Sequence, residues 1–286
     1  MNKFIISAFA DEIDPMLTTQ MDVLDQHGIR YIEMRGVNGK NLVEHTLEEV
    51  REIKKQLDAR GFRISAIGSP IGKIGITEDF EPHLALFRHT IEIAKILETS
   101  YIRMFSFYIP EGENPEKYRV EVMRRWSCFI KAAEETGLTL LHENEKGIYG
   151  DTAERCLDLL ETMDCSCMKA IFDPANFVQC NVKNYPDAFQ MLKKYVVYMH
   201  IKDALYKDHS VVPSGHGDGK VREILAELKN SGFEGFLSLE PHLGDFVGFA
   251  ALEPDSPSNQ LPEGGQKQFA IAAEALNKIL SELSAK

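Results

Sequence analysis

Residues 138–173, LTLLHENEKGIYGDTAERCLDLLETMDCSCMKAIFD, contain the pattern that decides the fold. The short apolar runs at 138–143 and 168–173 are typical of buried strands. Between them, Asp151 followed by Glu154 three residues later is typical of the N-terminus of a helix. A strand, a helix and a second strand in this order are one step of an alternating α/β fold.

The same alternation continues in both directions along the chain. Strand-like runs occur at 4–9, 30–35, 62–68, 101–106, 138–143, 168–173, 195–201 and 236–240. Helical patterns lie between and after them, at about 15–28, 46–61, 84–94, 114–137, from 151 onward, and at about 185–194, 220–231 and 265–283. The chain therefore contains eight strand–helix units.

Eight such units leave two architectures, a closed (β/α)8 barrel or an open doubly wound sheet, and the number of units and the chain length favour the barrel. No strand is followed by a G-x-G-x-x-G turn or a P-loop, so the nucleotide-binding folds lack their phosphate-binding glycines. We predict one (β/α)8 TIM barrel domain over residues 1–286. The long irregular segment 241–264 follows the eighth strand and is expected to lie over the barrel mouth.

The composition is that of a globular protein, with 44% hydrophobic and 27% charged residues. A formal net charge of −12 argues against a nucleic acid partner, because proteins that bind phosphate backbones normally carry a basic surface. No apolar run reaches the roughly 18 residues of a membrane span. The apolar segment at the N-terminus is too short for a secretory signal, and we interpret 4–9 as the first buried strand.

The cysteines are odd in number and show no C-x-x-C spacing, which is more typical of reduced cytoplasmic thiols than of a disulfide framework. They are Cys128, Cys156, Cys165, Cys167 and Cys180. A soft-metal site at Cys165 and Cys167 is a minor alternative. We expect a cytoplasmic protein, and leave open whether it forms a homo-oligomer.

Four chemically active residues stand at the ends of consecutive strands. Active sites of barrels lie at the carboxyl ends of the strands, where side chains alternate between the interior and the helix layer. This alternation sends Glu143, Asp173, His200 and Glu240 inward together, and His142 toward the helices. Three carboxylates this close would repel one another unless a cation lay among them. The set predicts a site for one divalent ion, Mn²⁺, Mg²⁺, Co²⁺ or Zn²⁺.

Further polar residues near the strand ends are candidates for substrate contact. They are Lys202, Asn176, Glu33, Arg103, His242 and His216. For each of them, a structural role is the alternative: a loop position for Lys202 and the histidines, turn chemistry for Asn176, and pairing of charges for Glu33 and Arg103. Glu145 could contact substrate, support the site or face solvent.

Five motifs carry a resemblance to a known family. HENEKGIYGDT, FDPANF, MHIKD, GHGDG and SLEPH, in this spacing, resemble the xylose isomerase-like TIM barrels, a superfamily of sugar phosphate isomerases and epimerases that also contains apurinic/apyrimidinic endonuclease family 2. The resemblance covers nearly the whole chain. It implies a metal site formed by a glutamate, an aspartate, a histidine and a glutamate, which falls on the same four residues that the strand ends indicate.

The resemblance implies a metal-dependent isomerase or epimerase that acts on a small carbohydrate. In the sugar-converting members, the two metal-bound glutamates form the acid/base pair, which here are Glu143 and Glu240. One removes a proton beside a carbonyl and the other returns it, through an enediolate that the metal stabilises. Asn176 replaces a histidine typical of ketose 3-epimerases, and Tyr149 stands where those enzymes have a glutamate.

Three other functions are compatible with the same residues to different degrees. The closest alternative is a lyase or dehydratase that acts on an inosose or a keto-glycoside and shares the enolate step. An abasic-site endonuclease is less expected, because that branch uses three zinc ions and extra histidines, whereas the corresponding places here read IGSP, FSFY and DPAN. A non-catalytic sugar-binding barrel would not need three adjacent carboxylates.

Overall fold

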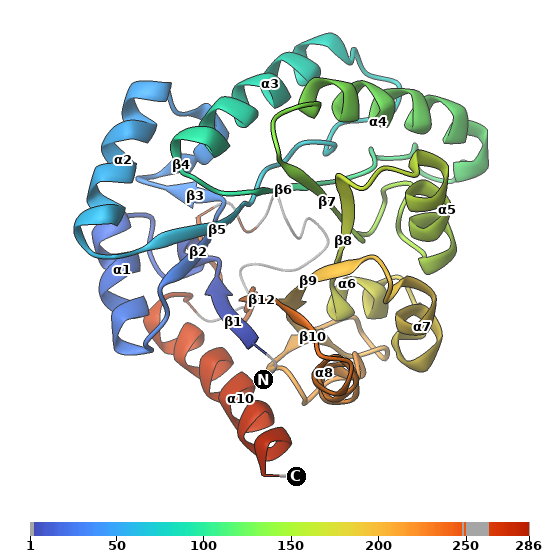
Figure 1. Ribbon diagram of the computed structural model, residues 1–286. Helices are drawn as coiled ribbons and strands as arrows, with labels where there is room; N and C mark the ends of the chain where they lie inside the picture. Colours follow the sequence, from blue (N-terminus) through green and yellow to red (C-terminus); the bar gives the residue numbers. More distant parts are fainter. Residues whose placement is uncertain (1–2, 248, 250–262, 286) are drawn as a thin grey trace.

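The computed structural model describes residues 3–247, 249 and 263–285. Its strands form a closed parallel barrel with the order β1-β12-β9-β8-β7-β6-β5-β2, in which β1 pairs with both β12 and β2 (Figure 1). The barrel strands are β1 (Lys3–Ala8), β2 (Tyr31–Met34), β5 (Arg63–Ile67), β6 (Tyr101–Met104), β7 (Thr139–Glu143), β8 (Met168–Phe172), β9 (Val196–Ile201) and β12 (Glu234–Leu239). The predicted (β/α)8 barrel is confirmed.

Helices surround the barrel (Figure 1). The α-helices are α1 (Leu17–Gln26), α2 (Leu47–Ala59), α3 (Glu81–Ile96), α4 (Arg119–Ala133), α5 (Ala153–Met163), α6 (Pro174–Gln179), α7 (Phe189–Leu192), α8 (Val221–Asn230) and α10 (Gln266–Ser284). Shorter helical turns are η1 (Ala10–Glu12), η2 (Leu42–Glu44), η3 (Pro115–Tyr118) and η4 (Asn184–Ala188), and two small ribbons are β3 (Gly36–Val37) with β4 (Lys40–Asn41) and β10 (Asp203–Ala204) with β11 (Val211–Val212). Among the described residues, none of the helices has the length and apolar character that a bilayer crossing requires.

The helix starts show how local chemistry sets the boundaries. Thr46 accepts a hydrogen bond from the Glu49 amide and the Glu49 carboxylate accepts one from the Thr46 amide, so α2 has the predicted capping box. The predicted cap of α5 was wrong by one residue. Thr152 accepts from the Arg155 amide, whereas the Asp151 carboxylate pairs with the Arg155 guanidinium.

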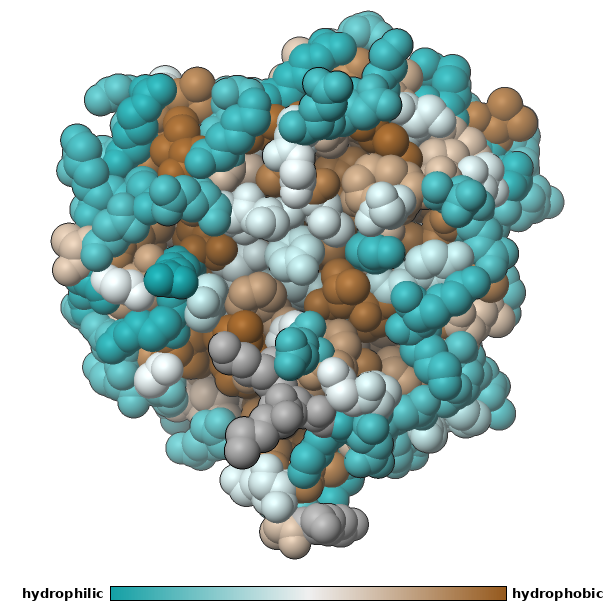
Figure 2. All heavy atoms as spheres, in the orientation of Figure 1, coloured by the Kyte–Doolittle hydropathy of each residue, from teal (hydrophilic) through white to brown (hydrophobic). Residues whose placement is uncertain are grey.

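Two layers of apolar side chains hold the barrel together. A small cluster inside it is formed by Ala66, Leu141, Ile171 and Tyr198, and a much larger one lies between the strands and the helices. The end of the barrel where the strands begin faces the viewer in Figure 2, with hydrophilic side chains around a paler centre. The interior is therefore closed by packing below the level at which the strands end.

One sequence-based expectation about cysteine is wrong. Cys165 and Cys167, in the loop before β8, form a disulfide, while Cys128, Cys156 and Cys180 are free. Residues this close in sequence can meet only when the intervening loop turns back on itself, and spacing rules for C-x-x-C pairs do not anticipate it. The interpretation of all five as reduced thiols therefore fails for this pair.

The loop after β5 is fixed by a buried histidine. The Gly72 amide donates a hydrogen bond to Nε2 of His83 on α3 at 2.7 Å, and a Cβ at Gly72, where φ is +94°, would collide with the backbone of Phe105. Burial, helped by the nearby Arg125, lowers the pKa of His83 to about 4. The neutral ring is therefore the form that accepts this bond.

This geometry predicts a loss of stability in acid. The contribution of His83 is complete above the pKa of an exposed histidine, ~6.5, and is lost as the pH falls through about 4. We expect it to amount to at most about 3 kcal/mol in the free energy of unfolding. Urea denaturation of His83→Gln between these pH values should show a flatter acid dependence than the wild type. If the free energy of unfolding fell equally steeply with pH in the variant and the wild type, this role of His83 would be contradicted.

Candidate metal centre

Four side chains from four neighbouring strands converge at one end of the barrel. Glu143 ends β7, Asp173 follows β8, His200 lies in β9, and Glu240 follows β12. Each offers a donor atom within 4.8 Å of the others, and all four are buried. The alternation along the strands thus places them as expected. His142 points the other way, where its ring meets Trp126 of α4.

His200 is the centre of this group. Its Nδ1 lies 3.0 Å from Glu143 Oε1, 3.5 Å from Asp173 Oδ2 and 3.4 Å from Glu240 Oε2. Its Nε2 faces the opposite way and lies 3.2 Å from Glu33 Oε2. One ring nitrogen therefore points into the set of three carboxylates and the other away from it.

Two of the sequence candidates bring positive charge to the carboxylates. Lys202 Nζ is 3.1 Å from Asp173 Oδ2 and 3.1 Å from Glu240 Oε2. Arg103 Nη1 is 3.3 Å from Glu143 Oε2 and 3.7 Å from Glu240 Oε1. Both cations are buried, so their charges act in a medium that screens them little. Burial would raise the pKa of Asp173, but Lys202 and His200 hold it below its usual range.

Sequence reasoning missed Arg35, which joins three acidic side chains. Its guanidinium lies 2.7 Å from Asp11 Oδ2, 3.2 Å from Glu12 Oε1 and 3.0 Å from Glu240 Oε1. The ring of Phe9 lies beneath it, 4.5 Å away. Burial opposes the charge of Arg35, but the acidic neighbours outweigh it and raise its pKa. Arg35 fixes one oxygen of Glu240 from the side of β2.

His242 belongs to the same network. Its amide donates to Glu12 Oε2 at 2.8 Å, and its Nε2 lies 3.4 Å from Glu12 Oε1 and 3.5 Å from Glu240 Oε1. Burial and Lys202 lower the pKa of His242, yet Glu12 and Glu240 raise it to a net value of about 9. Glu12, Glu240 and His242 could also be donors to an ion. Arg35 and a protonated His242 supply positive charge to the carboxylates of this group.

Two asparagines tie the ends of β7 and β8 together. Asn144 Nδ2 donates to the Asp173 carbonyl at 2.9 Å, and its Oδ1 accepts from the Asp173 amide at 2.9 Å. Asn176 Nδ2 donates to Glu143 Oε1 at 3.1 Å and to the Asn144 carbonyl at 3.0 Å. Turn chemistry was the structural alternative for Asn176 in the sequence, and it lies in α6, which Asp173 caps. Asp-Pro-x-Asn is a signature of a helix start that could have revealed this.

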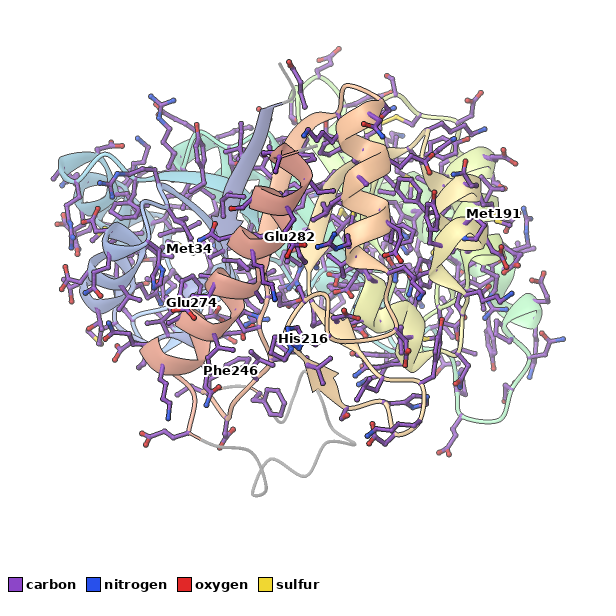
Figure 3. The ribbon with its side chains drawn as sticks, turned by 90° about the horizontal axis from the view of Figure 1, so that it is seen from below. Met34, Met191, His216, Phe246, Glu274 and Glu282 are labelled. Carbon is purple, nitrogen blue, oxygen red and sulfur yellow. A yellow bond between two sulfur atoms is a disulfide. The ribbon has the colours of Figure 1, made fainter. Side chains whose placement is uncertain are left out.

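The remaining candidates lie farther out. Glu145 is buried and pairs with Lys73 at 3.0 Å, while Lys73 also lies 4.4 Å from the centre of the Phe105 ring. His216 is exposed in the loop before α8, at the end of the molecule that also holds Phe246 (Figure 3). It is not among the residues of the metal-ligand group. The contact of His216 with substrate therefore stays a prediction.

The glycine-rich loop that carries His216 folds around the carboxylate of Asp203. Its carboxylate accepts hydrogen bonds from the amides of Gly215, Gly217 and Gly219 at 2.8 to 3.0 Å. A Cβ at Gly217 would collide with that carboxylate. The GHGDG motif is thus a loop wrapped around one buried acid.

Part of segment 241–264 covers the network. Phe246 and Phe249 pack on the His242 ring with centroid distances of 5.7 and 5.6 Å, and Arg35 lies 5.2 Å from the Phe246 ring centre. Residues 248 and 250–262 lie outside the described part of the chain. Phe246 and Phe249 thus form an aromatic wall against His242, which in turn contacts Glu240.

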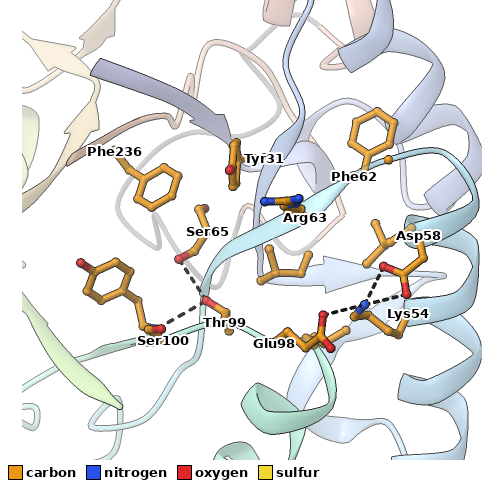
Figure 4. A pocket seen from close by; sticks show the side chains of 15 residues that line it. Tyr31, Lys54, Asp58, Phe62, Arg63, Ser65, Glu98, Thr99, Ser100 and Phe236 are labelled. Atoms are coloured by element: carbon orange, nitrogen blue, oxygen red, sulfur yellow. Dashed lines mark hydrogen bonds and ion pairs between the residues drawn. The ribbon is translucent and has the colours of Figure 1, made fainter. Parts of the chain in front are cut away.

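A cavity of about 640 Å³ lies elsewhere, where the strands begin (Figure 4). Its lining includes Tyr31, Arg63 and Tyr101, the first residues of β2, β5 and β6, and it also includes Phe236. Lys54, at its edge, already pairs with Asp58 and Glu98. Because catalytic groups of barrels gather at the other end, we do not place the active site here.

The converging side chains fit a divalent cation. Three carboxylates and one imidazole nitrogen supply hard oxygen donors and one nitrogen donor, the set that Mn²⁺, Mg²⁺, Co²⁺ and Zn²⁺ accept. Their donor atoms are close enough to reach one ion together. The structure thus forms a candidate site for one metal ion.

Comparison with known proteins places this geometry in a family. The model of the family described as xylose isomerase-like TIM barrel matches residues 21–280. The uncharacterized protein MJ1311 of Methanocaldococcus jannaschii is 25% identical over 161 residues, which cover 54% of this chain and 54% of that protein. The chain thus spans about half the length of this curated relative.

Solved structures share the fold over nearly their whole length. A D-tagatose 3-epimerase-like protein has a TM-score of 0.76 at 17% identity, covering 100% of this chain and 99% of that one. The probable 3-DHS dehydratase AsbF of Bacillus anthracis has a TM-score of 0.72 at 18% identity, covering 96% and 98%. The IOLI protein with a bound zinc atom has a TM-score of 0.72 at 16% identity, covering 99% and 99%.

At these identities the structural likeness shows the fold alone. The match to the family model is of another kind, because it extends over most of the sequence, from α1 to α10. The chain belongs to the xylose isomerase-like TIM barrel family.

Proposed function

We propose that the protein is a divalent-metal-dependent isomerase or epimerase of a sugar or sugar derivative. The observation that carries the proposal is the placement of Glu143 and Glu240. They come from β7 and β12, which are separated in the barrel by β8 and β9, so their carboxylates approach one centre from different sides. Two opposed carboxylates can remove a proton from one face of a carbon and return one to the other.

The residues of the chain would have separate roles. Glu143, Asp173, His200 and Glu240 would hold the ion, which would polarise the substrate carbonyl and stabilise the negative charge that proton removal creates. Lys202 and Arg103 lie beside the ligand carboxylates and could donate hydrogen bonds to substrate oxygens. The aromatic wall of Phe246 and Phe249, which packs on His242, would limit access of water.

Whichever glutamate removes the proton must be ionised, and the charges around Glu240 meet this condition. Burial raises the pKa of a carboxyl group, but Lys202, His242 and His200 together hold the pKa of Glu240 well below its usual range. Its carboxylate therefore stays ionised before substrate arrives. The similar D-tagatose 3-epimerase-like protein and the zinc-containing IOLI protein support this choice of chemistry and cofactor.

A lyase or dehydratase is the second candidate. Lys202 Nζ, 3.1 Å from Glu240 Oε2, places an acid beside this glutamate, where it could protonate an oxygen that leaves after the shared enolate step. Likeness to the probable dehydratase AsbF also supports it. The two functions share proton removal and differ in the fate of the enolate.

Exchange with solvent tests both candidates. The metal-loaded protein would be incubated in D2O with ketoses, inososes and keto-glycosides, and the products examined by NMR and mass spectrometry. We expect deuterium beside the carbonyl together with an isomer or epimer, and no exchange after treatment with a chelator. Loss of water would establish the lyase instead. Binding without exchange for every compound would contradict both and support a sugar-binding barrel.

A further inference from the structure

Glu33 occupies a position that the proposed chemistry does not use directly. It lies in β2, is completely buried, and its two carboxylate oxygens are 3.3 and 3.2 Å from Nε2 of His200. Its contact is thus with the side of the ring that faces away from Glu143, Asp173 and Glu240. Direct substrate contact, the alternative raised by the sequence, stays a prediction.

The contact decides which nitrogen of His200 can bind an ion. A neutral imidazole carries one N–H, and its other nitrogen holds the lone pair that binds metals. A carboxylate oxygen accepts hydrogen bonds, so Glu33 keeps a proton on Nε2. Nδ1 lies 3.0 Å from a carboxylate oxygen of Glu143, so a bound ion would take the place of a proton there and leave the proton that Glu33 accepts. The lone pair is then on Nδ1, the atom that lies 3.0 to 3.5 Å from the three ligand carboxylates.

We infer that Glu33 is the positioning residue of the metal centre, which holds His200 in the orientation and tautomer that present Nδ1 to the ion. This inference rests on the metal dependence in the proposed function. Partners of this kind orient histidine ligands and make them more basic, and their loss typically lowers metal affinity 10- to 100-fold. In this role Glu33 acts through His200.

Metal affinity of matched variants tests the inference. Zn²⁺ and Mn²⁺ binding to the whole protein would be measured by calorimetry for the wild type, Glu33→Ala and Glu33→Gln. We expect Glu33→Ala to bind about 10- to 100-fold more weakly. Glu33→Gln should recover most of this loss, because its carbonyl oxygen can still accept from Nε2–H. Glu48→Gln, which changes an exposed carboxylate of α2 paired with Arg51, is the control and should keep the wild-type affinity.

A second measurement needs no variant. In the zinc-loaded protein labelled with ¹⁵N-histidine, NMR should show His200 with a proton on Nε2 and none on Nδ1. Coordination through Nε2 would overturn the inference, and so would an affinity of folded Glu33→Ala within about twofold of the wild type. Failure of the wild type to bind any divalent ion would instead reject the proposed function. Thermal unfolding without metal checks that each variant is folded.

Discussion

Glutamine at Glu143 or Glu240 is expected to lower turnover by at least about 10² to 10⁴-fold, the usual contribution of a general acid or base. The amide has nearly the shape of the carboxylate but cannot take up the proton. It is also a weaker ligand for a divalent ion. Both side chains are buried and accept hydrogen bonds on both carboxylate oxygens, and an amide keeps one of these acceptors, so thermal unfolding checks that each variant is folded.

The measurement combines rates with metal content, because loss of the ion alone would also stop turnover. Exchange and product formation would be followed at metal concentrations that saturate each variant, and the bound metal determined on the same sample. Glu48→Gln, which makes the same change at an exposed position of α2, is the control and should retain activity. Near wild-type turnover by either ligand variant with bound metal would refute the acid/base assignment.

Removal of Arg35 should have the largest effect on stability. Arg35→Met leaves the carboxylates of Asp11, Glu12 and Glu240 without the cation that joins them. Breaking a buried ion pair by removing one partner typically costs about 3 to 5 kcal/mol, because the remaining charge stays buried. The variant should also lose activity, since Oε1 of Glu240 loses its fixed partner.

Urea denaturation of Arg35→Met at pH 8 and pH 5 would measure this loss. Without the guanidinium, the buried carboxyl groups bind protons more readily in the folded than in the unfolded protein. The difference in unfolding free energy between Arg35→Met and the wild type should therefore shrink as the pH falls. Arg60→Met is the control. Arg60 pairs with Asp22 and Asp25 at the surface, where its side chain is 31% exposed, and such pairs contribute about 0 to 1 kcal/mol. Equal losses in the two variants would show that the buried ion pairs of Arg35 do not stabilise the fold more than surface pairs do.

Much of the fold could be predicted because it depends on short-range patterns. Apolar runs such as 138–143 and 168–173 end within one residue of the observed β7 and β8. Once the strand ends are known, alternation alone decides that Glu143 faces inward and His142 outward. The four candidate ligands were therefore available from the sequence before any distance was known.

The features that the sequence did not reveal are of two kinds. Some depend on contacts between residues far apart in the chain, and others on a choice between adjacent residues that could fill the same role equally well. Arg35 and Glu240 are 205 positions apart, and no local pattern links them. Asp151 and Thr152 are both good helix caps, and the competing ion pair with Arg155 decided between them. The disulfide of Cys165 and Cys167 likewise depends on the path of a loop, which spacing alone does not determine.

The paired hydrogen bonds of Asn144 have a consequence for the choice of ion. They join the end of β7 to the end of β8, so Glu143 and Asp173 are held together as one unit. Glu240 lies across the site, where Arg35 contacts one of its oxygens and Lys202 joins the other to Asp173. If an ion binds here, we expect Glu143 and Asp173 to keep their spacing and Glu240, which is held only through side-chain contacts, to make most of the adjustment to ions of different radius.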